Sequence, residues 1–336
     1  MAGSISRALR VWALLAVLAG VALLVALASG SALIDPLDVP RLLFSPDDSA
    51  AAEVLHSLRL PRALNALAVG GLLALAGALM QVLLRNPLAD PYVLGISGGA
   101  AAGALTALAV GLGALAVQGG ALAGAMLTTV AVFAIAHRDL ARVAAPGTLD
   151  NAPRLLLTGV MLAAGWGALI MLMLSLAPEA RLRGMLFWLA GDLSGAGSPQ
   201  WPLLALALLL AASWPLARDL NVLLRGPLAA AALGVRVVRL RWCLYGLASA
   251  AAAVAVTTAG SIGFIGLVVP HALRLLLGND QRVLLPACVL AGGALLLLAD
   301  TLARTVVAPM QLPVGVITAL IGVPSFLVLL LRKGAH

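Results

Sequence analysis

The residues of this sequence that could carry acid–base or nucleophilic chemistry are few and scattered. His271 follows Pro270 in an apolar stretch and has no obvious nucleophile beside it. An intramembrane protease would need a Ser/His or Asp/Asp pair at membrane depth, and the sequence has neither an HExxH motif nor facing aspartates. His271 is expected to be a packing or hydrogen-bonding residue, with a proton or substrate ligand as the alternative. An intramembrane enzyme is therefore not favoured.

The sequence also gives little support for ion-coupled transport or for metal binding. A secondary transporter would favour acids inside its spans as proton or ion relays, and Asp300, near a helix end, is the clear candidate. Cys243 and Cys288 lie far apart in apolar stretches, without metal-ligand spacing, so we expect small buried residues and no metal site. The sequence has no P-loop, so any ATP hydrolysis must come from a partner protein.

Two arginines stand in a polar break at residues 177–200. Arg181 and Arg183 would lie near an outer mouth if the segment 183–193 forms a short helix there. They are expected either to be solvated arginines at the membrane interface or to meet an anionic substrate.

The elements that position these residues are membrane helices. Of the 336 residues 62% are hydrophobic and 10% are charged, whereas a water-facing surface needs roughly a quarter. The 35 glycines suit close helix packing in a bilayer. The net charge of +8 comes from single basic residues between apolar runs, which argues against a nucleic-acid partner. We predict an all-α membrane protein, with residues 1–336 forming a single transmembrane domain.

The apolar runs predict ten transmembrane helices, since about 20 apolar residues cross the hydrocarbon core. The expected spans are 11–33, 62–83, 93–112, 117–136, 154–176, 200–216, 240–259, 262–277, 283–303 and 313–331. The first is taken as a helix rather than a signal peptide because many spans follow it.

The distribution of Lys and Arg predicts the orientation. With the N-terminus inside, 15 of the 21 basic residues fall on the inner side, and the outer side holds Arg41, Arg59, Arg62, Arg181, Arg183 and Arg304. Both termini are therefore expected to be cytoplasmic.

Three segments depart from a plain membrane helix. The turn 85–99 contains two prolines and is either a tight cytoplasmic turn or the inner mouth of a pathway. The segment 221–237 is too short and broken to span, and predicts two short helices at the cytoplasmic surface. These form either an interfacial amphipathic helix or a docking surface for a cytosolic partner. Pro270 is expected to kink or break the helix that contains it.

Eight blocks in series resemble the FecCD family of bacterial ABC importer permeases, the type II importers for vitamin B12, haem and ferric siderophores. They are LRLPR (58–62), GALMQVLLRNPLADPYVLGISGGA (77–100), RLLLTGV (154–160), FWLAGDLS (187–194), LGVRV (233–237), GFIGLVVPHALRLLLGNDQRVLLP (263–286), LLADTLAR (297–304) and PVGVITALIGVPSFLVLLLRK (313–333). The resemblance covers residues 58–333.

The resemblance implies a homodimer of ten-helix subunits in the bacterial inner membrane. Two cytosolic ATPase subunits, which hold ATP and Mg, would drive it, and a periplasmic binding protein would deliver the substrate. The family's helices that dock onto the ATPases match the cytoplasmic segment 217–239, with contacts expected from Asn221, Leu224, Arg225, Ala231, Leu233, Gly234 and Val235. The family often has acidic residues before the Ala-rich stretch, where this chain has Pro227 and Leu228.

The remaining site residues also follow from the resemblance. Docking of the binding protein is implied for Arg59, Arg62 and Arg304, all of which the charge count independently places outside. The inner gate is implied to include Asn86, Leu88 and Asn151. A bulky metal chelate is the expected substrate. Haem is preferred because Arg181 and Arg183 could attract its carboxylates, with corrinoids and ferric siderophores as alternatives.

The orientation can be tested with reporter fusions. A fusion at Ala50 should report the periplasm and one at Gly226 the cytoplasm, because the basic residues cluster on the Gly226 side. Activity of both fusions on the same side would contradict this topology.

Overall fold

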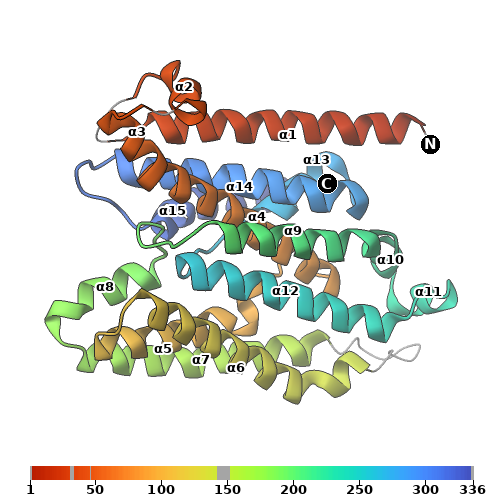
Figure 1. Cartoon of the computed structure of the whole chain (residues 1–336). Coiled ribbons are helices and arrows are strands. Elements are labelled where there is room, and N and C mark those ends of the chain that lie inside the picture. Colours follow the sequence, from red (N-terminus) through yellow and green to blue (C-terminus); the bar gives the residue numbers. More distant parts are fainter. Residues whose placement is uncertain (1, 31–33, 46, 142–151, 334–336) are drawn as a thin grey trace.

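The chain forms a helical bundle in which the described spans run back and forth between two ends (Figure 1). The computed structural model describes residues 2–30, 34–45, 47–141 and 152–333, and this part of the chain contains no strand. The helices are α1 (Ala2–Ala28), α2 (Asp38–Phe44), α3 (Ala50–Val54), α4 (Leu60–Leu83), α5 (Ile96–Val110), α6 (Ala114–Ala141), α7 (Ala152–Leu176), α8 (Glu179–Leu189), α9 (Gln200–Ser213), α10 (Ala217–Leu223), α11 (Pro227–Ala232), α12 (Val237–Ala259), α13 (Ile265–Leu277), α14 (Gln281–Thr305) and α15 (Val314–Lys333). A π-helical turn, Leu55–Arg59, joins α3 to α4, and 3-10 turns occupy Pro91–Leu94 and Trp214–Leu216.

Each of the ten expected spans corresponds to a helix. Among the described residues, seven helical segments are long and apolar enough to cross a membrane by length and composition. The other three expected spans are shorter apolar helices, in α5, α13 and the described apolar part of α15. The polar outer insert, for which no helix was expected, contains α2 and α3.

The break after the sixth span differs from the expectation. Helical structure continues from α9 through Trp214–Leu216 into α10, so that Gln200–Leu223 is one 24-residue span. Two short helices do follow one another in the cytoplasmic segment, but α10 is the end of the membrane helix and α11 alone is detached from it. The short outer helix expected at 183–193 is α8, which begins earlier, at Glu179.

Pro270 was expected to kink or break its helix, and the helix does not break, because α13 continues through this residue. Pro270 lacks the N–H that would bind the carbonyl of Gly266, four residues earlier. The buried side chain of Gln81 supplies a substitute from α4, since its Nε2 donates to the carbonyl oxygens of Leu267 at 3.2 Å and Gly266 at 3.5 Å. A donor from another helix thus compensates for the proline, as membrane helices require.

Helix α4 is the centre of the bundle, with α9, α12, α13 and α14 packed around it. Its glycines allow backbones to touch. A Cβ on Gly77 would lie 1.8 Å from the carbonyl oxygen of Gly266 in α13, and one on Gly70 would lie 2.2 Å from that of Gly292 in α14. The hydrophobic effect does not hold helices together in lipid, so they depend on close van der Waals packing. Small residues at the helix crossings allow that close packing.

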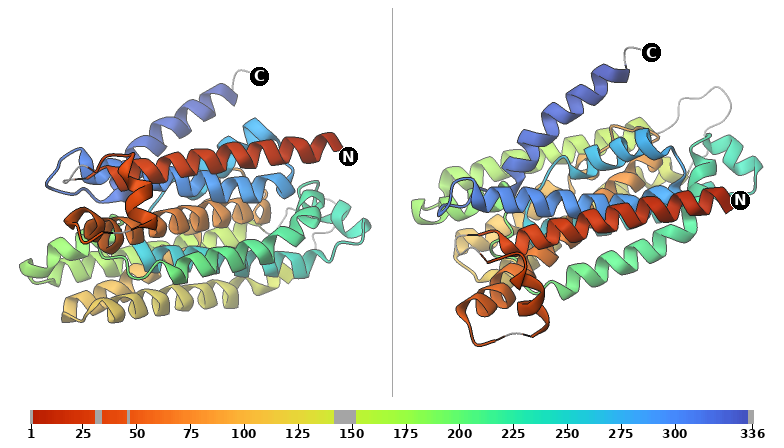
Figure 2. Two further views of the ribbon diagram at one scale, coloured as in Figure 1. Left: turned by 45° about the horizontal axis from the view of Figure 1, so that its top comes forward. Right: turned by 90° about the horizontal axis from the view of Figure 1, so that it is seen from above.

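The two ends of the bundle differ in content. The N-terminal end of α1 lies at the same end as α10 and α11, whereas α2, α3 and α8 lie at the opposite end (Figure 1). The charge distribution assigns the first end to the cytoplasm and the second to the outside. Helix α15 leans away from the other helices (Figure 2).

The close contact of α4 with α13 gives a stability prediction. Gly77→Ala should lower the free energy of unfolding by about 3 kcal/mol, because the new methyl group would force the two backbones apart. Thermal unfolding of the purified protein in detergent measures this effect. Gly165→Ala, on α7 with nothing within 4 Å of the added Cβ, is the matched control and should leave stability unchanged or slightly raised. Equal losses in both variants would contradict the packing role of Gly77.

Candidate functional site

The three arginines expected to dock a binding protein meet at the outer end of α1, α4 and α14. Arg62 grips Asp300 with two nitrogens, its Nη2 lying 2.8 Å from Oδ1 and its Nε 3.0 Å from Oδ2. Arg304 lies on the other side of this carboxylate, with its Nε 3.4 Å from Oδ2. Asp300, considered as an ion relay, is therefore the anionic centre of a structural cluster.

The arginines also close the C-terminal end of α1. Arg59 donates from Nη1 to the carbonyl oxygens of Leu27 at 2.7 Å and Ala28 at 3.0 Å. Arg304 donates to Ala26 and Ser29 in the same turn. The last carbonyls of a helix lack partners within it and carry partial negative charge, so cations there stabilise the end.

These contacts leave the side chains of the three arginines largely buried. Arg59 is 6% exposed, and the side chains of Arg62 and Arg304 are 14% and 11% exposed. The three arginines lie together at one end of the bundle, where contacts within the chain occupy most of their charged groups. Docking of a binding protein by these residues stays a prediction, with Arg62 the most accessible of the three.

The cytoplasmic segment around α10 and α11 presents both inward and outward residues. Asn221 faces inward: its Nδ2 donates to Asp280 Oδ1 at 2.8 Å, and its Oδ1 accepts the N–H of Gln281 at 2.8 Å. Leu224 and Val235 are half-buried against the core. The exposed members of the expected coupling set are Arg225, Ala231, Leu233 and Gly234.

Asp280 therefore connects α10, through Asn221, to the start of α14. It caps that helix by accepting the N–H of Arg282, and it also binds the Arg282 guanidinium at 2.7 Å. The hydrogen bond from the Arg282 side chain, with a second from Asn221, lowers the pKa of Asp280 to about 2, so it stays ionised at cytoplasmic pH. The sequence analysis did not identify this residue, although its place directly before an apolar run is typical of a helix N-cap.

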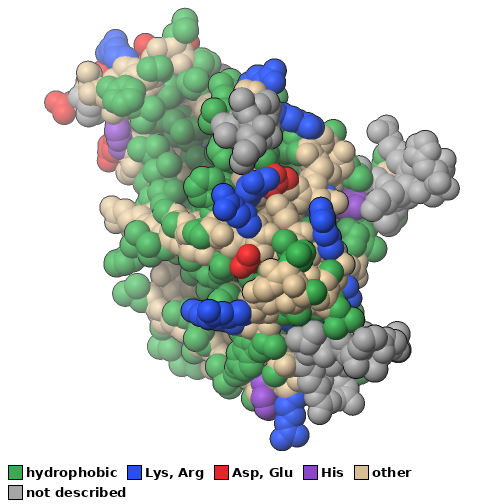
Figure 3. Space-filling view, turned by 90° about the vertical axis from the view of Figure 1, so that its right-hand side faces the viewer, with side chains coloured by type: hydrophobic (Ala, Val, Ile, Leu, Met, Phe, Trp, Pro, Cys, Tyr) green, Lys and Arg blue, Asp and Glu red, His purple; other side chains and the backbone are tan. Residues whose placement is uncertain are grey.

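The cytoplasmic end of the bundle is basic on its surface. Figure 3 looks onto this end and shows several separate Lys and Arg side chains with few acidic ones between them. Exposed arginines of this end include Arg218, Arg225, Arg236 and Arg239, on or beside α10, α11 and α12.

The inner-gate residues lie in the turn after α4. The side-chain oxygen of Asn86 accepts the N–H of Leu88 at 2.9 Å, which shapes the turn around Pro87. Both residues are exposed, so they are accessible at the cytoplasmic end. Asn151, the third expected gate residue, lies outside the described residues. No structural observation tests the gating role itself.

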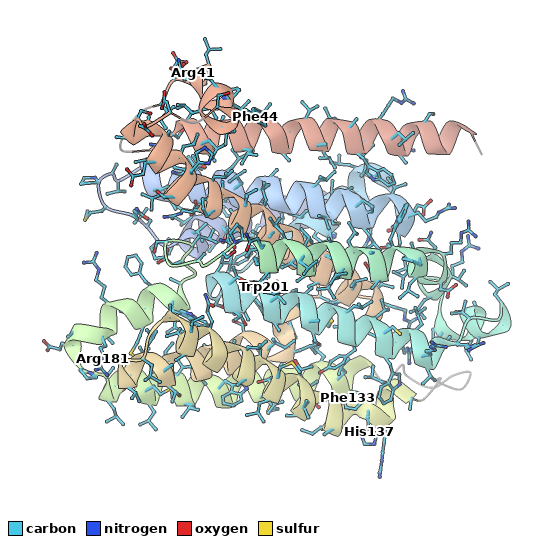
Figure 4. The ribbon with its side chains drawn as sticks, in the orientation of Figure 1. Arg41, Phe44, Phe133, His137, Arg181 and Trp201 are labelled. Carbon is cyan, nitrogen blue, oxygen red and sulfur yellow. The ribbon has the colours of Figure 1, made fainter. Side chains whose placement is uncertain are left out.

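The outer arginines of α8 have different environments. Arg181 donates to the carbonyl oxygen of Ala109 at the end of α5, and Figure 4 shows it at the same end of the bundle as Arg41 of α2. Arg183 lies over the ring of Phe187, with its Cζ 5.5 Å from the centroid, and borders a cavity. Both arginines are exposed, but of the two Arg183 is the one that lines this cavity.

The described residues form no site suited to hydrolysis or to metal binding. Residues 95–99 match G-x-S-x-G, but Ser97 opens a helix in a bundle without strands, and its hydroxyl pairs with Ser261 at 2.5 Å rather than with a histidine. His271 is buried with its ring 6.2 Å from that of Phe326, consistent with packing. Among the described residues, His, Cys, Asp and Glu form no group that could hold a metal.

An all-helical bundle in which seven described helical segments are long and apolar enough to cross a membrane has the architecture of a transporter subunit. The chain belongs to the FecCD transport family, whose model matches residues 16–332. It is a multi-pass ABC importer permease of the inner membrane, and this class works with ATPase and substrate-binding partners.

Individual relatives agree with this assignment. The chain is 40% identical over 324 residues to the vitamin B12 import system permease protein BtuC of Escherichia coli O139:H28, covering 95% of this chain and 94% of the relative. The same identity and coverage relate it to BtuC of Escherichia coli K12. A solved metal-chelate type ABC transporter in an inward-facing conformation superposes with a TM-score of 0.83 at 29% identity, covering 96% of this chain and 99% of the other. PsaBC from Streptococcus pneumoniae, at 16% identity and a TM-score of 0.52, shares the fold alone.

The buried charge of Asp300 gives a second prediction. Asp300→Asn should lower the free energy of unfolding by about 3 kcal/mol, because Arg62 and Arg304 would be left without their shared anion. Asp47→Asn is the matched control. It removes the exposed Arg41–Asp47 pair, whose side chains are 67% and 42% exposed, and should cost under about 1 kcal/mol. Thermal unfolding of both variants measures the two losses of stability. A fully stable Asp300→Asn protein would contradict the structural role of Asp300.

Proposed function

We propose that this chain is the permease subunit of a corrinoid importer that carries vitamin B12 from the periplasm to the cytoplasm. The observation that carries the proposal is the 40% identity to vitamin B12 permeases over 95% of the chain. The aligned region spans nearly the whole chain, so it is not confined to one part of the fold.

The initial preference for haem is not supported. It depended on Arg181 and Arg183 acting together on carboxylates, but only Arg183 of the two lines the outer cavity. One arginine at this cavity suits a substrate with one anionic group, such as the phosphodiester of a corrinoid. Ferric siderophores remain the alternative among metal chelates.

The working assembly in this proposal is a homodimer with two ATPase subunits and a periplasmic binding protein. The leaning helix α15 supports the dimer, because it leaves apolar side chains such as Leu320, Ile321 and Leu327 exposed beside the bundle. The outward residues of α10 and α11 support ATPase docking, since the exposed Leu233 and Arg225 lie on a segment that is otherwise fixed through Asn221. ATP and Mg would be held by the partner subunits.

Transport by the reconstituted importer tests the substrate. Vesicles containing this chain, its ATPase subunits and its binding protein should accumulate cyanocobalamin when ATP and Mg are present. Vesicles with an ATPase subunit unable to hydrolyse ATP are the control and should accumulate none. Uptake of haemin or a ferric siderophore without uptake of cyanocobalamin would contradict the proposal.

A further inference from the structure

Four breaks in helical structure meet within the bundle. The N–H of Asp192, after α8, donates to the carbonyl of Ala259 at the end of α12, at 2.9 Å. The N–H of Val314, at the start of α15, donates to the carbonyl of Gly191 at 2.9 Å. The Ser97–Ser261 pair joins the start of α5 to the same place.

This junction lies within the bundle, and two short helices run from it in opposite directions. Helix α5 has 15 residues and runs from the junction to the outer end, where Gly111 lies against Arg181. Helix α13 has 13 residues and runs the other way, to the cytoplasmic turn before Asp280. At 1.5 Å per residue these helices are about 22 and 20 Å long, so neither alone crosses a core of about 30 Å.

Irregular backbone at membrane depth is tolerated where it is enclosed by protein or lines a cavity, and substrates of transporters bind at such interruptions. A cavity of about 670 Å³ opens beside this junction, between the outer ends of α5 and α6, helix α8 and the end of α12. Its volume is within the range of small-molecule sites. We refer to it as the outer pocket.

The outer pocket combines an apolar wall with a few polar groups. Leu108, Val117 and Trp188 contribute apolar surface, and Gln118 and Asp192 contribute hydrogen-bonding side chains. The Asp192 carboxylate accepts the N–H of Ser194 at 2.8 Å, which holds it in position.

Two of the lining groups lack a polar partner. The Oγ1 of Thr257 has no hydrogen-bond partner among the described residues, but it is fully buried and so is not exposed to the pocket. Arg183 is exposed, stacks on Phe187 and forms no ion pair within the described chain. Arg183 is therefore the charged lining group that a ligand in the pocket can reach.

We propose that the outer pocket is a binding site for one edge of the imported corrinoid, an inference that rests on the function proposed above. Corrinoids are bulky and largely apolar, and they carry amide side chains and a phosphodiester. Arg183 pairs with the phosphodiester, Gln118 and Asp192 bind amide groups, and Trp188 packs against the ring system. The pocket then selects the substrate before it enters the pathway.

Two pairs of variants test the site in the reconstituted importer. Arg183→Gln should raise the KM for cyanocobalamin uptake about tenfold, the loss expected for one charge-assisted hydrogen bond. It should leave uptake of cobinamide, a corrinoid without the phosphodiester, unchanged. Gln118→Leu should raise the KM for both corrinoids about fivefold, because it removes the amide that lines the pocket.

The controls are neighbouring residues whose polar groups do not face the pocket. Thr258 lines the pocket, but its hydroxyl donates to the carbonyl of Val254 at 2.8 Å, and Arg181 is not among the lining residues. Thr258→Val and Arg181→Gln should retain the wild-type KM. Unchanged KM values in Arg183→Gln and Gln118→Leu, or equal rises in the controls, would overturn the site while leaving corrinoid transport established. A wild-type importer that takes up no corrinoid would overturn the proposed function and this site with it.

Discussion

A chain surrounded by lipid has to satisfy its backbone polar groups from within, and the interruptions of this bundle are built around that requirement. The carbonyl that Pro270 leaves without a donor is reached by Gln81 from another helix. The last carbonyls of α1 are bound by Arg59 and Arg304. In both places a side chain distant in sequence completes a helix that could not be completed locally.

Close backbone contact makes these completions geometrically possible. Gln81 can reach α13 because Gly77, one turn earlier on the same helix, lets α13 approach α4. The contact between Gly70 and Gly292 likewise brings α14 against α4, so that Arg62 of one helix and Asp300 of the other meet at the outer end. Small residues thus determine where the charges of the outer cluster can pair.

Helix α14 connects the two functional ends of the subunit. Its cytoplasmic end is bound through Asp280 and Gln281 to Asn221 of α10, and its outer end carries Asp300 and Arg304. The cytoplasmic attachment uses an exposed, permanently ionised carboxylate, whereas the outer one uses a buried carboxylate between two arginines. One continuous helix therefore joins the segment expected to contact an ATPase to the cluster expected near a binding protein.

The sequence by itself predicted the number of spans, their direction and the cytoplasmic position of the segment around Arg225. Apolar length and the placement of arginines are local properties of the chain, and they determine directly how it inserts into a bilayer. The tertiary structure alone decided what the polar residues do. Arg62 and Asp300 are 238 positions apart, the role of Gln81 depends on a proline in another helix, and the free hydroxyl of Thr257 differs from its satisfied neighbour Thr258 only in what surrounds it. Hydrogen bonds and ion pairs act over about 3 Å, so they depend on how the helices pack, which the pattern of a single sequence does not specify.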